Sequence, residues 1–121
     1  MGEKQVRNWV VFCHLGGLIP ICFLNVVIPW IIWLTQKSES SFIDEQGKEI
    51  INFQISLTIY SIALSFIAWT TIAASTIVGY SIACLGWIVL IVLNIIFIIK
   101  GAIKASKGEK FLYPINLRLI K

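Results

Sequence analysis

The stretch Ser41-Phe-Ile-Asp-Glu-Gln-Gly-Lys-Glu-Ile-Ile-Asn-Phe-Gln-Ile-Ser56 runs from dense charge directly into a long apolar segment. Ser41 and Asp44 have the spacing of a capping box, and Asp44 and Lys48 form a favourable i,i+4 pair on a sparse apolar stripe. These features predict an interfacial helix over residues 41–50, which lies along a membrane surface and then turns into a membrane span.

The composition places the whole chain in a membrane. Of its 121 residues, 58% are hydrophobic and 13% are charged, and the mean hydropathy is +0.87. A chain this short cannot bury so much apolar surface in a core of its own, because small domains leave much of their surface exposed. The sequence therefore predicts an all-α integral membrane helical bundle. Cys13, Cys22 and Cys84 lie in apolar surroundings without metal-ligand spacing and are interpreted as small buried hydrophobic residues.

Two segments are long and apolar enough to cross a bilayer, since about 20 apolar residues suffice. Residues 50–74 form the predicted second span and residues 80–100 the third. The short uncharged turn between them makes an antiparallel hairpin. Thr58, Ser61, Ser65 and Ala68 recur at helical spacing, which is typical either of close helix contact or of hydroxyls bonded to their own backbone.

The first apolar segment, residues 9–34, is interrupted by Gly16-Gly17, Pro20, Asn25 and Pro29. Proline removes a helix hydrogen bond and clashes with the preceding turn, so we expect a break near residues 20–25. Two arrangements remain, a single kinked span or a hairpin of two short arms, which gives three to four membrane segments in total.

The distribution of Lys and Arg favours the hairpin. In that arrangement the N-terminus, the central loop and the tail lie on one side, and all ten basic residues lie there with none opposite. Because basic loops stay on the inner side, residues 101–121 are predicted to be a basic cytoplasmic tail. These basic residues flank a span and no base-stacking motif accompanies them, so no nucleic-acid partner is predicted.

Three polar residues at membrane depth, His14, Asn25 and Asn94, form a candidate polar pathway. Asn94 lies six residues before Lys100 and so should face the bundle interior. The alternative interpretation for each is a packed, hydrogen-bonded residue without a transport role.

Several short motifs are shared with a known family. They centre on His14, on Pro29 to Leu34, on Phe42 to Ser56, and on Gly108 to Arg118. Their members are His14, Pro29, Trp33, Phe42, Asp44, Gly47, Lys48, Asn52, Phe53, Gln54, Gly108, Glu109, Tyr113, Pro114 and Arg118. With these motifs the chain resembles a family of small bacterial membrane proteins of unknown function related to the twenty-kilodalton subunit of Tic, the protein import translocon of the chloroplast inner envelope. At Gln46 many relatives are expected to have His, which argues against a metal there.

That resemblance implies a helical membrane bundle with both termini in the cytoplasm, and no known activity. The import role would be an analogy at the level of fold. The chain has no long leader rich in Ser and Arg, so we expect a prokaryotic plasma-membrane protein.

An enzyme is the least supported function. The sequence contains one His and neither HExxH, a phosphate loop nor a Ser-His-Asp set, so no catalytic residue, metal or cofactor is predicted. Two hypotheses remain. The first is a non-enzymatic scaffold or interaction subunit that contacts the lipid bilayer and other membrane proteins or itself, linked to protein translocation or insertion. The second is a small oligomeric channel or transporter.

Overall fold

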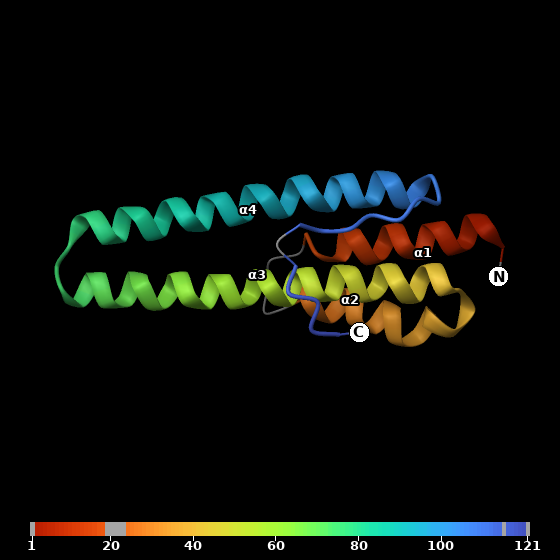
Figure 1. The fold of residues 1–121 in the computed structure, drawn as a ribbon, viewed down its shortest axis with the longest axis horizontal. Helices are drawn as coiled ribbons and strands as arrows, with labels where there is room; N and C mark the ends of the chain where they lie inside the picture. Colours follow the sequence, from red (N-terminus) through yellow and green to blue (C-terminus); the bar gives the residue numbers. More distant parts are fainter. Residues whose placement is uncertain (1, 19–23, 115, 121) are drawn as a thin grey trace.

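The computed structural model describes residues 2–18, 24–114 and 116–120, and it contains helices without strands in those ranges. The helices are α1 (Glu3–Gly16), α2 (Leu24–Gln36), the short 3-10 turn η1 (Lys37–Glu39), α3 (Ser41–Ala73) and α4 (Ile77–Ser106) (Figure 1). The prediction of an all-α fold is confirmed. α3 and α4 are both long and apolar enough to cross a membrane.

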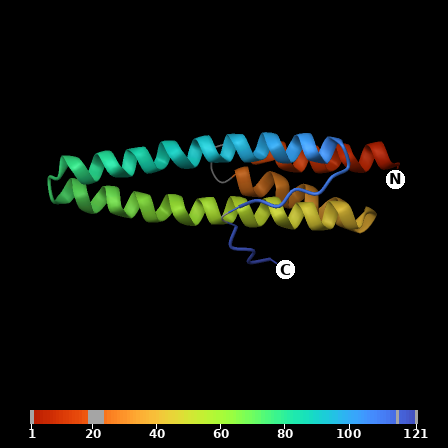
Figure 2. The same cartoon turned by 45° about the horizontal axis from the view of Figure 1, so that its top comes forward.

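α3 and α4 form a long antiparallel hairpin that runs the length of the molecule (Figures 1 and 2). The chain reverses at Ser75, whose φ of 54° is in the left-handed region. Gly86 lets the two helices approach closely, because a Cβ there would lie 2.9 Å from Leu64 Cδ2. Of the helices that the structure describes, α1 and α2 do not cover the half of the hairpin next to this turn (Figures 1 and 2).

α1 and α2 pack beside the other half of the hairpin, where α3 begins and α4 ends (Figure 2). They run antiparallel to each other, and Gly16 permits their contact because a Cβ there would lie 2.7 Å from Ile28 Cγ2. Most of the buried apolar residues lie here and include Val10, Cys13, Ile43, Ile50, Phe53, Ile98 and Ala105. The molecule therefore has a four-helix half with a core and a two-helix half in which most large apolar side chains are exposed.

Residues 41–50 differ from the predicted interfacial helix. They are the first turns of α3, which continues to Ala73 without a break. The stripe of Ile43, Gly47 and Ile50 is buried in the bundle, because α1 and α2 cover it in place of a membrane surface. The helix cap is also one residue earlier than predicted. Ser40 has extended backbone, and its Oγ accepts a hydrogen bond from the Phe42 N–H at 3.1 Å.

Residues 9–34 contain parts of two helices, and α1 already begins at Glu3. The predicted break falls mainly on residues 19–23, including Pro20, which lie outside the described residues. Asn25 lies in the first turn of α2, and Pro29 lies inside that helix and is buried. In the structure the Pro29 carbonyl accepts a weak hydrogen bond from Cys13 Sγ at 3.5 Å, which ties α2 to α1.

The predicted basic cytoplasmic tail over residues 101–121 does not begin where the helix ends. α4 continues to Ser106, with Gly101, Ala102 and Ala105 buried against its neighbours. The residues that follow turn back along the bundle and pack on α3 (Figure 1). The segment packs there because α3 offers contacts to its apolar side chains and hydrogen-bond partners to its polar groups.

Candidate functional site

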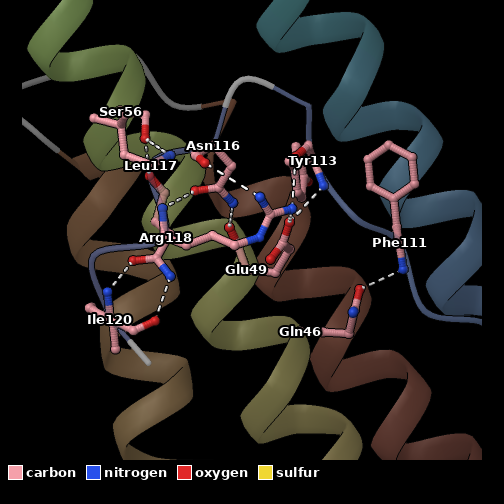
Figure 3. Close-up of polar contacts among 10 residues, drawn as sticks. Gln46, Glu49, Ser56, Phe111, Tyr113, Asn116, Leu117, Arg118 and Ile120 are labelled. Atoms are coloured by element: carbon pink, nitrogen blue, oxygen red, sulfur yellow. Dashed lines mark hydrogen bonds and ion pairs between the residues drawn. The ribbon is translucent and has the colours of Figure 1, made fainter.

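A stripe of polar side chains runs along the buried side of α3. Gln46, Glu49, Asn52 and Ser56 are three, three and four residues apart, so they face the same direction. All four are buried. The chain after Gly108, described for residues 109–114 and 116–120 and called here the C-terminal strap, lies along this stripe (Figure 3).

The stripe binds the strap through the strap's backbone. The N–H of Phe111 donates to Gln46 Oε1 at 3.0 Å, and the N–H of Leu117 donates to Ser56 Oγ at 2.9 Å. The Asn52 amide makes a reciprocal pair with Ile120, accepting from its N–H at 2.7 Å and donating to its C=O at 2.8 Å. An extended backbone usually forms its hydrogen bonds with a neighbouring strand. Here the side chains of α3 provide hydrogen-bond partners for the strap's backbone instead.

Glu49 is the centre of this network. Its Oε1 accepts from the Tyr113 N–H at 2.7 Å and from the Arg118 guanidinium at 3.2 Å (Figure 3). Its own backbone carbonyl accepts from the Asn116 side chain at 3.1 Å. A buried carboxylate needs such partners, because charge removed from water without compensation is costly.

Tyr113 anchors the strap in the core. Its ring is 1% exposed and stacks on Phe53 with 4.3 Å between ring centroids. Its hydroxyl lies 2.6 Å from His14 Nδ1 on α1. Burial raises the pKa of Tyr113, with smaller contributions from Cys13 and Glu49. The hydroxyl therefore stays protonated and available for hydrogen bonding.

His14 is fully buried, and its ring lies next to Gly101 of α4. Gly101 follows Lys100, so this contact lies toward the charged end of the bundle. Burial lowers its pKa to about 4, and a contribution from Gln46 opposes the change. Among the described residues, Nε2 of His14 has no hydrogen-bond partner. Gln46 therefore forms no hydrogen bond of standard geometry with this atom. The neutral imidazole is thus part of the packing that holds Tyr113.

The strap leaves α4 through a sharp turn. Gly108 has a φ of 75°, which suits glycine, and the Arg7 guanidinium of α1 lies against it. Arg7 also pairs with Glu3 on its own helix. Glu109 donates its backbone N–H to the Lys104 carbonyl at 2.9 Å, which closes the end of α4.

A second polar cluster lies deeper, where α1 and α2 meet the hairpin. Asn25 donates to Gln54 Oε1 at 2.9 Å, Gln54 donates to Asn94 Oδ1 at 2.8 Å, and Asn94 donates to the Gly17 carbonyl at 3.2 Å. This chain of amides connects all four helices. It lines a cavity of about 350 Å³ between α3 and α4.

The structure places the three residues of the candidate pathway in two locations. Asn25 and Asn94 meet through Gln54 and line the cavity, whereas His14 faces Tyr113 and is not part of the lining. Thr58 and Ser65 donate their hydroxyls to carbonyls one turn back on α3. Thr58, Ser61 and Ser65 also line the cavity, so this part of the predicted strip lies on the inner face of the hairpin.

Most motif residues gather at the four-helix half. Trp33 of α2 donates its indole N–H to Asp44 at 2.8 Å, and Asp44 pairs with Lys48 at 2.8 Å. Gly47 leaves room for the indole, because a Cβ there would lie 2.5 Å from Trp33 Cδ1. Phe42 is half-buried against the core, and Pro114 is exposed in the strap. These residues bind the helices and the strap to one another.

Sequence reasoning missed three residues of the strap site, Gln46, Glu49 and Ser56. The sequence pattern that could have identified them is a row of polar residues at helical spacing in the first turns of an apolar helix. Such a stripe needs hydrogen-bond partners, whereas the basic residues of 101–121 predict only a cytoplasmic tail. Within the described ranges, no three His, Cys, Asp or Glu side chains come together to hold a metal ion.

Comparison with curated proteins and with solved structures finds no match. A family model does match, over residues 5–120, and its description is the magnetosome magnetite crystal formation protein family, MamF/MmsF. The predicted resemblance to the Tic subunit is therefore wrong. Its motifs are interfacial aromatic residues, helix starts and turn residues, which unrelated helical membrane proteins can share, whereas the family model covers nearly the whole chain. The chain belongs to the magnetosome magnetite crystal formation protein family.

Proposed function

We propose that this chain is a structural, non-enzymatic protein of a bacterial membrane. We further propose that it takes part in magnetite crystal formation, the process that its family's description names. The observation that carries the proposal is the separation of charge from apolar surface. No Asp, Glu, Lys or Arg occurs between residues 50 and 99, while the N-terminus, the α2–α3 turn and the end of α4 lie together at the opposite end from the uncharged turn (Figure 1).

The apolar half of the hairpin suits the interior of a bilayer. α3 has 33 residues and so reaches about 50 Å, against about 30 Å for a hydrocarbon core. The exposed side chains near the turn are large and apolar, such as Phe66, Trp69 and Ile77. The surplus length of α3 supports a position of the four-helix half at the membrane surface on one side.

The polar groups of the four-helix half support a structural role. Gln46, Glu49, Asn52 and Ser56 are engaged in holding the strap, and His14 is buried against Tyr113. A catalytic centre needs reactive groups that face a substrate, and these groups face the chain itself. We propose that the charged half faces the cytoplasm, because all ten basic residues lie on that side in this topology.

In that orientation the opposite membrane face receives only the turn around Ser75 and Thr76, which offers hydroxyls and no carboxylates. We therefore propose that the chain organises the membrane around a crystal and does not bind mineral directly. A channel would require a continuous polar path, whereas His14 and the amide cluster lie apart.

Topology can be tested with single cysteines at Glu3, Val78 and Lys107 in a variant that lacks the three native cysteines. In intact cells, an impermeant maleimide should label only position 78 when the chain resides in the plasma membrane. Labelling of position 3 would contradict the orientation. Deletion in a magnetite-forming host should change crystal size or number, and a deletion strain with unchanged crystals would contradict the structural role.

A further inference from the structure

The cavity between α3 and α4 has one polar end and an apolar remainder. The polar end is the amide chain of Asn25, Gln54 and Asn94, of which Gln54 is fully buried. Thr58, Ser61 and Ser65 add hydroxyl oxygens along one wall. The other walls are apolar and consist of Leu57, Ile62, Trp87, Leu90 and Ile91.

The cavity opens toward the bilayer. Ile62 and Ile91 on its lining are 61% and 52% exposed. Asn94 lies six residues before Lys100, or about 9 Å along the helix, so the amides lie below the charged boundary. α1 ends at Gly16 and α2 begins at Leu24, next to the amides, and among the described helices neither covers the rest of the hairpin (Figure 1). A ligand would therefore enter sideways from the hydrocarbon region.

Toward the described residues, the amides retain capacity for a ligand. An amide group has two N–H donors and an oxygen with two lone pairs, and its hydrogen bonds to described residues use one N–H of each side chain. The volume of about 350 Å³ falls within the range of small-molecule sites, which are mostly apolar with a few converging polar groups.

The ligand's charge follows from the lining. Among the described residues that line the cavity there is no Lys, Arg, Asp or Glu. A charged head group would lose its water there without an opposite charge, which is strongly unfavourable, whereas a hydroxyl or ester carbonyl needs only hydrogen bonds.

We propose that this cavity binds an uncharged, lipid-like amphiphile, with its hydroxyl or ester head on Gln54 and Asn94 and its chain along Leu57 and Leu90 toward the bilayer. The site is independent of the proposed structural role, which needs no ligand.

The test uses the purified chain in lipid nanodiscs with a monoacylglycerol that carries a photoreactive diazirine in its chain. After illumination, mass spectrometry should find the label on peptides that contain Ser61 and Trp87. An excess of unlabelled monoacylglycerol should remove most of that label, and an alkane of equal chain length should not. Equal competition by the alkane would overturn the proposal, because it would mean ordinary contact with bilayer chains.

Variants locate the site. Ser61→Phe fills the cavity and should abolish specific labelling. Asn94→Leu removes a head-group partner and should lower labelling about 5-fold, as expected for the loss of about 1 kcal/mol. Asn8→Leu is the matched control, since Asn8 is exposed at the charged end and should leave labelling unchanged. Thr58→Val is nearly isosteric, so it serves if Asn94→Leu does not fold, and it should also lower labelling.

The rival occupant is a second copy of the chain. A cysteine at position 61, in the cysteine-free variant, would then form a disulfide between copies in the nanodisc, and that result would also overturn the proposal. Unchanged labelling in Ser61→Phe and Thr58→Val, with both variants folded, would overturn it as well.

Discussion

Tyr113→Ala is expected to release the C-terminal strap from α3. The ring is 1% exposed, stacks on Phe53 and places its hydroxyl 2.6 Å from His14 Nδ1. Truncating a buried aromatic residue costs about 3–5 kcal/mol, partly as lost transfer free energy and partly as the remaining cavity. The cost should fall on the strap, which has no secondary structure of its own to retain it.

The assay is hydrogen exchange of the strap's amides in detergent or nanodiscs. Each 1.4 kcal/mol of lost local stability accelerates exchange about tenfold, so the N–H groups of Phe111, Tyr113 and Leu117 should exchange at least about 100-fold faster. Leu112→Ala is the matched control, because this neighbouring side chain is 70% exposed and should change exchange little. Tyr113→Phe keeps the ring and should cost about 1 kcal/mol.

The reasoning would be refuted if Tyr113→Ala left strap exchange within about threefold of the unmodified chain, or if Leu112→Ala had the same effect. Either result would mean that the backbone bonds to Gln46, Glu49 and Ser56 hold the strap without their aromatic anchor.

Three further predictions follow from the same half of the molecule. Glu49→Ala should destabilise the chain by about 1–3 kcal/mol, because the buried Tyr113 N–H and Arg118 lose their acceptor; thermal unfolding checks this, and Glu49→Gln should lose less because it keeps an oxygen. Burial lowers the pKa of His14 to about 4, so the unfolded chain binds the proton more readily than the folded chain. The free energy of unfolding is therefore highest above about pH 6.5 and should fall by about 3 kcal/mol as the pH drops toward 4. Unfolding measured against pH for the unmodified chain and for His14→Asn isolates this contribution, and parallel curves would contradict it. Gly47→Ala should cost about 1–3 kcal/mol and weaken the Trp33 to Asp44 hydrogen bond, since the new methyl meets the indole, whereas Gly2→Ala has open space around it and should be neutral; an unchanged unfolding temperature for Gly47→Ala would contradict the close contact.

The sequence by itself determined the class of the molecule. Uncharged apolar runs of this length suit helices that span lipid, so residues 50–74 and 80–100 are recognisable without coordinates; α3 contains the first segment up to Ala73, and α4 contains the second. The local pair of Asp44 and Lys48 was also readable, because i,i+4 spacing on a helix is fixed by the helix itself.

Only the tertiary structure decided what the polar residues do. Gln46 and Glu49 are 65 and 64 residues from their partners Phe111 and Tyr113, and no local spacing links them. The same holds for the amide chain, in which Asn25 and Asn94 meet because α1 and α2 fold beside the hairpin. For the same reason the sequence predicts an interfacial helix at residues 41–50. The apolar stripe of this segment predicts burial, but only the packed bundle determines whether lipid or protein covers the stripe.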